Sequence, residues 1–326
     1  MTRFLHIAIS LVLLSVVTLP MTAEAQTYPA KPIRVVVGYP PGGGVDYTAR
    51  LVSQRLSSEL GQPIIVENRA GAGGTIGEEF VSRADPDGYT ILYAVGSDLA
   101  SRKFLTRKPT IDPLRDLTPV ATVVGSVNCI VVGPSFPAKS FKELVESAKR
   151  NPGKLTYGTS GVQSYYYLIG ELLKQNGMNM LHVPYKGNAP VVTALIGGEI
   201  DIALVNFAAV LPHLNSGKAK ALAVLESRRY AGAPDVPTVS EVLPAFKAPL
   251  SWFGFFGPPG LPQPIVERLN AEVAKALESP EVSSKIGAVH LNILITPPAQ
   301  LRSFIMDTSD SFSKIIKSAN IQPSDG

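Results

Sequence analysis

Residues 33–50 read IRVVVGYPPGGGVDYTAR and predict a strand, a glycine-rich turn and a helix in immediate succession. The β-branched run at 33–37 is typical of a buried strand, and three glycines, Gly42, Gly43 and Gly44, follow it. A strand that ends in such a loop and opens a helix directs several backbone N–H groups at one point. These groups and the helix dipole together favour an anion. The stretch therefore predicts an α/β chain with an anion site at the end of its first strand.

A second glycine-rich loop, Gly-Ala-Gly-Gly at 71–74, lies between another predicted strand and another predicted helix. Two such loops this close in the chain indicate one wall of an anion-binding cleft. A tight turn that requires positive φ is the alternative for a single loop. The first loop lacks the G-x-G-x-x-G spacing of a dinucleotide fold, and no Gly-Lys-Ser/Thr follows it. Neither nucleotide-binding motif is therefore present.

The first 25 residues have the features of a secretory signal. Arg3 supplies the positive start, and the apolar stretch at 7–19 is short for a membrane span. The tripeptide Ala-Glu-Ala at 23–25 gives the small-x-small pattern of a cleavage site. We therefore expect cleavage after Ala25 and a periplasmic mature chain. An uncleaved membrane anchor is the alternative.

Composition argues against several classes of function. The net charge is +4, charged residues make up 17% of the chain, and no basic block stands out, so nucleic-acid binding has no support. The single cysteine, Cys129, rules out an internal disulfide and a cysteine-based metal site. The histidines that remain after cleavage lack Glu-x-x-His or His-x-His spacing, and no G-x-S-x-G elbow presents a nucleophilic serine. We therefore expect no catalytic residue, no metal and no cofactor.

Strand-like and helix-like patterns alternate along most of the chain. Continuous apolar runs predict strands buried on both faces, as in parallel sheets, at 33–37, 63–67, 89–95, 128–133, 154–158, 180–185, 201–205 and 219–225. Amphipathic helices are predicted near 46–60, 140–151 and 164–176 and in two C-terminal stretches. Ser140 and Glu143 have the spacing of a capping box. Because ligands collect at the carboxyl ends of parallel strands, we expect the loops after these strands to share one site.

The order and spacing of these segments resemble the Bug-type solute-binding receptors of tripartite tricarboxylate transporters over residues 28–321. The resemblance is carried by segments such as YPAKPIRVVVGYPPGGGVDYTAR (28–50), HVPYKGNAPVVTALIGGEIDIAL (182–204) and WFGFFGPPGLP (252–262). It implies an α/β type II periplasmic binding-protein fold, in which two lobes with parallel-rich sheets hold a ligand in the cleft between them. It also implies a small carboxylate ligand, namely a dicarboxylate, a tricarboxylate, an acidic amino acid or an aromatic acid. A membrane permease is the implied partner, and we expect the receptor to be a monomer.

Two crossover stretches divide the chain into lobes. After the signal at 1–25, residues 26–127 are expected to form the first part of the first lobe, and residues 128–249 the second lobe. Residues 250–326 then return to complete the first lobe. Neither crossover carries a long polar linker, so we expect strands rather than a loose tether to connect the lobes.

The resemblance implies ligand contacts from loops of both lobes, residue by residue. In the first lobe these are the two glycine loops and a hydroxyl after the third strand: Tyr39, Gly43, Gly44, Val45, Ala72, Gly73 and Ser97. In the second lobe they are Ser160, Gly161, Gln163, Ser164, Tyr167 and Asn206.

Several positions depart from the family pattern. Gln163 stands where a glycine is usual, Tyr167 where a histidine is usual, and Asn206 where many relatives have an aspartate. The segment GSDLASRKFL at 96–105 departs as well. Gln163 and Tyr167 favour either stacking against an aromatic acid or a smaller pocket. The carboxylate anchor is therefore better defined than the identity of the ligand.

Our interpretation is a periplasmic carboxylate receptor rather than an enzyme. One alternative is a sensory co-receptor that uses the same two-lobed clamshell to report a metabolite to a membrane partner, and the sequence does not separate the two. A weaker alternative is an α/β hydrolase or transferase, which would need an activated nucleophile and a base.

Overall fold

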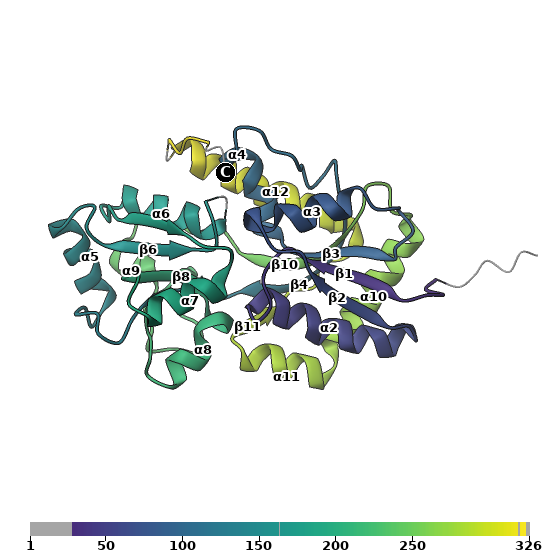
Figure 1. The fold of residues 1–326 in the computed structure, drawn as a ribbon, viewed down its shortest axis with the longest axis horizontal. Coiled ribbons are helices and arrows are strands. Elements are labelled where there is room, and N and C mark those ends of the chain that lie inside the picture. Colours follow the sequence, from purple (N-terminus) through teal and green to yellow (C-terminus); the bar gives the residue numbers. More distant parts are fainter. Residues whose placement is uncertain (1–27, 163, 319, 324–326) are drawn as a thin grey trace, which may run out of the picture.

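A computed structural model of the chain describes residues 28–162, 164–318 and 320–323. It has two α/β lobes side by side, each built on one central sheet (Figure 1). The expected signal at 1–25 and the expected ligand contact Gln163 lie outside the described residues. Within the described part of the chain, no helix combines the length and the apolar character needed to cross a membrane.

The sheet of the first lobe has the strand order β11-β4-β10-β3-β1-β2. Its strands are β1 Ile33–Val37, β2 Ile64–Asn68, β3 Thr90–Val95, β4 Thr118–Ser126, β10 Trp252–Gly257 and β11 Leu291–Ile293. β1 pairs in parallel with β2 and β3, whereas β10 runs antiparallel to β3 and β4. The helical segments of this part are α2 Gly44–Leu60, η1 Ala72–Gly74, α3 Thr75–Ser82, α4 Gly96–Leu105, α10 Gln263–Glu278, α11 Pro280–Ala288 and α12 Pro298–Ser318.

The sheet of the second lobe has the strand order β7-β6-β8-β5-β9. Its strands are β5 Asn128–Val132, β6 Thr156–Thr159, β7 Leu181–Pro184, β8 Ile202–Asn206 and β9 Lys220–Val224. β6 pairs in parallel with β7 and β8, whereas β5 runs antiparallel to β8 and β9. The helices of this lobe are α5 Phe141–Arg150, α6 Tyr165–Gln175, α7 Asn188–Ile196, α8 Phe207–Asn215 and α9 Val239–Val242.

Both sheets are therefore mixed, which corrects the expectation that the apolar run at 128–133 is a parallel strand. The direction of each strand depends on which of its ends lies at the interface between the lobes. β1, β3, β6 and β8 end at the interface between the lobes, where their following loops meet. β5 and β10 begin at that interface, because the chain enters them directly from a crossover. A strand that leaves the interface must run against neighbours that arrive there.

The two crossovers between the lobes are short and lie side by side. Val127 alone separates β4 in the first sheet from β5 in the second. The second crossover reaches β10 through Ser251, whose carbonyl accepts a hydrogen bond from Ser126 N at 2.8 Å. This backbone hydrogen bond fixes the two connections to each other where the chain passes between the sheets.

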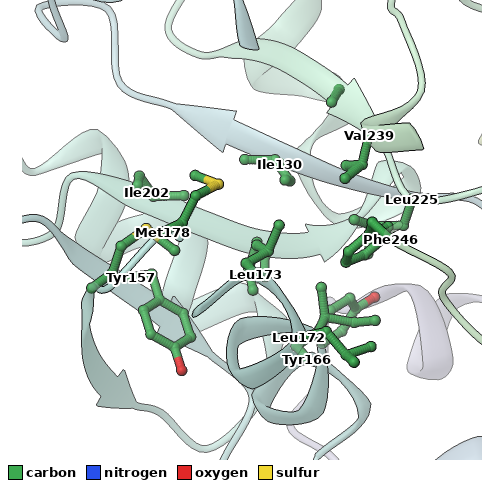
Figure 2. Close-up of a cluster of buried hydrophobic side chains, with 14 of the residues drawn as sticks. Ile130, Tyr157, Tyr166, Leu172, Leu173, Met178, Ile202, Leu225, Val239 and Phe246 are labelled. Atoms are coloured by element: carbon green, nitrogen blue, oxygen red, sulfur yellow. The ribbon is translucent and has the colours of Figure 1, made fainter. Parts of the chain in front are cut away.

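Each lobe has its own buried core. In the second lobe, Ile130 of β5, Ile202 of β8 and Leu173 of α6 belong to one cluster (Figure 2). Burying an apolar side chain of this size stabilises the fold by about 1.5–3 kcal/mol. The same cluster includes Phe312 of α12, whose ring centroid lies 6.3 Å from that of Tyr165. The C-terminal helix therefore packs on the second lobe as well as the first.

Candidate functional site

A small cavity lies between the lobes, at the carboxyl ends of the parallel strands. Its volume of about 30 Å³ is enough for water but not for an organic acid. Its lining combines apolar and polar groups from both lobes: Tyr39, Pro40, Gly43, Gly44, Val45, Val95, Asp98, Ser160, Tyr165, Tyr166, Asn188, Ala189, Asn206, Ser251 and Phe253. In this conformation the lobes are thus closed around the space between them.

Five helices begin at this cavity. Its lining includes Gly44 at the start of α2, Val95 before α4, Tyr165 at the start of α6, Asn188 at the start of α7 and Asn206 before α8. The first N–H groups of a helix have no partner within that helix, and they carry a partial positive charge. Five such ends around one cavity make it a favourable place for a carboxylate.

Two of the five helix ends are occupied by side chains. Asn206 Oδ1 accepts a hydrogen bond from Ala209 N of α8 at 2.8 Å. At α6, Ser164 Oγ accepts from Tyr167 N at 3.2 Å, and Asp98 Oδ1 accepts from Tyr165 N at 2.7 Å. No described side chain caps α2, α4 or α7. The N-termini of α2 in the first lobe and α7 in the second are therefore available to a ligand.

The first glycine loop is shaped by Asp46. Its carboxylate accepts hydrogen bonds from Gly42 N at 3.1 Å and Asn68 Nδ2 at 2.8 Å, and it pairs with Arg50. Burial would raise the pKa of Asp46, but the hydrogen bonds from Arg50, Asn68 and Gly42 hold it below its ordinary value. Asp46 is thus engaged by the loop, and its negative charge is directed at the protein and not at an incoming anion.

The second glycine loop is held from below by Tyr39 and Arg102. Gly73 O accepts from Arg102 Nη2 at 2.7 Å, and the Tyr39 hydroxyl oxygen lies 3.0 Å from it. Arg102 also forms a buried ion pair with Glu78, which is 1% exposed. Burial raises the pKa of Glu78 above its ordinary value, against the opposing effect of Arg102. The loop therefore rests on a buried charged pair.

The structure places the expected site residues in different surroundings. Six of them line the cavity: Tyr39, Gly43, Gly44, Val45, Ser160 and Asn206. Ala72, Gly73 and Gly161 line a neighbouring hollow of about 300 Å³, together with Tyr185 and Lys186. Ser97 and Ser164 are buried; Ser97 Oγ lies 3.2 Å from Ser251 Oγ, and Ser164 is the cap of α6. These two residues support groups that line the cavity.

Tyr167 lies away from the cavity. Its ring packs on His182, with 5.1 Å between the ring centroids, and both residues line a hollow on the second lobe. Tyr165 and Tyr166 line the cavity instead. Successive helical residues point about 100° apart, so three neighbouring tyrosines cannot all face one side. The structure thus does not bring Tyr167 to the place where the resemblance implies a ligand contact.

Tyr165 and Tyr166 connect the cavity to the two crossovers. The Tyr166 hydroxyl donates to Asn128 Oδ1 at 2.6 Å, directly after the first crossover. The Tyr165 hydroxyl donates to Pro249 O at 3.0 Å, at the second crossover. These two hydrogen bonds therefore couple the positions of the tyrosine rings to the positions of the two crossovers.

The cavity lining also contains residues that were not among the expected ligand contacts: Pro40, Val95, Asp98, Tyr165, Tyr166, Asn188, Ala189, Ser251 and Phe253. Most of these positions carry no distinctive sequence signal, because an apolar residue that lines a cavity looks like a core residue. Tyr165 and Tyr166, in a triplet of tyrosines after a glycine-containing loop, did carry a signal, and so did Asp98. Asp98 lies in GSDLASRKFL, the segment that departs from the family pattern, and an aspartate there is a candidate site residue.

The cavity lacks the groups of a metal site. Among the described residues, no group of three or more His, Cys, Asp or Glu side chains could hold a metal ion. The acidic group of the cavity, Asp98, already accepts from the Tyr39 hydroxyl and from Tyr165 N. What the lining offers is helix N-termini, hydroxyls and aromatic walls, which suit the binding of a small organic anion.

Comparison with known proteins agrees with this geometry. Residues 48–321 match the family model described as the tripartite tricarboxylate transporter family receptor. Protein BugT of Bordetella pertussis is 35% identical over 320 residues, which cover 97% of each chain. Rpa4515 of R. palustris, solved with adipate, has a TM-score of 0.87 and 31% identity over 91% of this chain and 100% of that one. MatC of Rhodopseudomonas palustris, with bound malate, has a TM-score of 0.82 and 30% identity over 89% of this chain and all of its own.

The family model covers well over half of the chain, and BugT is 35% identical over nearly the whole length of both chains. The solved relatives extend the agreement to the two-lobed fold and to a ligand-binding role. The chain therefore belongs to the receptor family of the tripartite tricarboxylate transporters.

Proposed function

We propose that this chain is a periplasmic receptor that captures a small carboxylate between its lobes and delivers it to a membrane permease of the tripartite tricarboxylate type. The observation that carries the proposal is the uncapped N-terminus of α2 at the cavity, where Gly43, Gly44 and Val45 line the space. The relatives solved with adipate and with malate support a carboxylate as ligand. Cleavage after Ala25 and a monomeric receptor belong to the same proposal.

The proposed role includes no catalytic step. Among the described residues that line the cavity there is no histidine, cysteine or lysine to act as a nucleophile or base. The serines of the lining, Ser160 and Ser251, have no such base beside them in that lining. A binding site that closes on its ligand and releases it unchanged fits these groups better than one that activates a bond.

A matched pair of glycine substitutions tests the carboxylate site. Gly43 has φ −83°, and a Cβ built there meets no described atom within 4 Å, so Gly43→Ala keeps the backbone unstrained. The methyl group would still occupy space beside the free N–H groups of α2. We expect ligand affinity to fall about tenfold, or ~1.4 kcal/mol, as measured by titration calorimetry with the acid found by mass spectrometry of the purified protein.

Gly287→Ala is the matched control, because Gly287 lies in α11 and its Cβ also meets no described atom within 4 Å. It should leave the affinity unchanged. Equal affinities for the wild type and both variants would remove the start of α2 from the site. Turnover of the bound acid would refute the receptor role. If growth on the ligand proceeds without the permease, the chain would instead serve as a sensor.

A further inference from the structure

Asp98 is a buried carboxylate that reaches from one lobe to the other at the cavity. It lies in the first turn of α4, is 2% exposed and lines the cavity. Its Oδ1 atom accepts from Tyr165 N, the first residue of α6 in the second lobe, at 2.7 Å. Its Oδ2 atom accepts from the Tyr39 hydroxyl at 2.6 Å. The N-terminus of α6 is thus filled by a carboxylate that belongs to the protein.

The charge of Asp98 is not balanced by its surroundings. The charged groups that act on it are Arg102 on α4 and Glu78 on α3, which form a buried ion pair with each other. Arg102 is further engaged by Gly73 O at 2.7 Å. The groups that contact Asp98 from other elements, the Tyr39 hydroxyl and the Tyr165 amide, are neutral. An ionised Asp98 therefore leaves one negative charge beside the cavity.

Asp98 retains room for another donor, since each carboxylate oxygen can accept two hydrogen bonds and the described contacts use one each. Aromatic rings of Tyr39, Tyr165 and Tyr166 line the same cavity. A carboxylate with tyrosine rings beside it attracts an ammonium group by charge and by cation–π contact. A second carboxylate at this point would meet a like charge with little water to screen it, which opposes binding.

We propose that Asp98 determines specificity, by selecting a ligand that carries one carboxylate and, at its far end, an ammonium group. The inference rests on the proposed function, because the ligand carboxylate is the group expected at α2. It narrows the ligand to amino-carboxylates with separated charges and rejects dicarboxylates of the same length. Burial raises the pKa of Asp98 above its ordinary value, and a ligand cation would supply the compensation that the protein itself lacks.

The test uses acids matched in length that differ only at the far end. One set is butanoate, 4-aminobutanoate and succinate, and the other is hexanoate, 6-aminohexanoate and adipate. Titration calorimetry at pH 7 should show that the wild type binds the amino acid of at least one set about tenfold more tightly than the dicarboxylate. Asp98→Asn keeps an acceptor for Tyr165 N and removes the charge. It should reverse the order, weakening the amino acid about tenfold and strengthening the dicarboxylate.

Asp201→Asn is the control. Asp201 is also a carboxylate that accepts from a backbone amide, Thr156 N at 2.8 Å, but it lies outside the cavity lining. It should leave the wild-type order unchanged. A wild type that binds adipate or succinate at least as well as the amino acid overturns the inference and leaves the receptor role standing. A wild type that binds none of the six acids also overturns the inference. The receptor role is overturned only if the acid found with the purified protein fails to bind as well. An Asp98→Asn variant that keeps the wild-type order, with a melting temperature showing that it is folded, also overturns the inference.

Discussion

At the residue scale, the glycines of the first loop have different structural roles. Gly42 has φ +88°, a conformation that glycine adopts easily and other residues rarely do. Gly43 has φ −83°, so its backbone does not require glycine. These two neighbouring glycines therefore have different roles. Gly42 makes the turn, and Gly43 leaves space beside the N-terminus of α2. The sequence predicted the loop but could not divide these roles, because φ depends on how the chain leaves β1 and enters α2.

Glu226, which follows β9, is a partly buried acid that contacts the first crossover, and it gives a pH prediction. Its Oε1 atom accepts from Asn128 N at 2.9 Å, and burial raises its pKa from an ordinary 4.5 to about 7. The folded state thus binds this proton more tightly than the unfolded state. Ionisation of Glu226 therefore lowers the free energy of unfolding as the pH rises from about 4.5 to about 7.

We expect Glu226→Gln to flatten this part of the stability curve. The amide keeps an acceptor for Asn128 N but cannot ionise. At pH 8 the variant should be more stable than the wild type by about 2 kcal/mol, allowing for partial exposure, and at pH 4.5 the two should be close. Urea unfolding at both pH values measures this. Glu146→Gln, an exposed position on α5, serves as control, and parallel curves for wild type and Glu226→Gln would contradict the prediction.

At the element scale, the apolar runs predicted most of the strands. The runs at 33–37, 89–95, 201–205 and 219–225 correspond to β1, β3, β8 and β9. The order of strands and the antiparallel direction of β5 were not predictable, because period and composition say where a strand is but not which neighbour it meets. The capping box at Ser140 is only half present. Ser140 Oγ accepts from Glu143 N, but the Glu143 carboxylate accepts from Lys139 N instead of the cap residue.

The caps of α5 and α6 give a matched prediction. Ser140 caps α5 on the outside of the second lobe, and Ser164 caps α6 next to the cavity, where it also donates to Gly161 O at 2.7 Å. Alanine at either position should cost about 1 kcal/mol of stability, as measured by urea unfolding. Only Ser164→Ala should also weaken ligand binding, because it loosens the start of the helix that carries Tyr165 and Tyr166. Equal losses of affinity in both variants would show that the effect on binding is general.

At the scale of the whole molecule, the binding site exists only where the lobes meet. Gly44 begins α2 in the first lobe and faces Asn206, the cap of α8 in the second. A Cβ built at Gly44 would lie 3.0 Å from Asn206 Oδ1 and 3.2 Å from Ala208 Cβ. Such contacts are closer than side chains normally allow. A glycine here therefore lets the lobes close.

We expect Gly44→Ala to fold normally but to close poorly. Small-angle scattering should show the same radius of gyration as the wild type without ligand and a larger one at saturation, since hinge closure brings rigid lobes together. Affinity should fall about tenfold, or ~1.4 kcal/mol. Gly43→Ala is the control, because its methyl group meets no described atom of the second lobe and should still allow compaction. Full compaction of Gly44→Ala at saturation would show that this contact does not limit closure.

The α/β class, the glycine loops, most strands and, through the resemblance, the family were all predictable from the order of residues. These features depend on local patterns or on residue order, both of which can be read along the chain. By contrast, the packing of the two lobes brings Tyr165 and Tyr166, but not Tyr167, to the cavity, and it places Asp98 at the start of α6. The physical reason is that the site is built from helix ends of two lobes. The chemistry of the site depends on which side chain of one lobe contacts which helix N-terminus of the other. The spacing of residues along the chain does not predict these contacts.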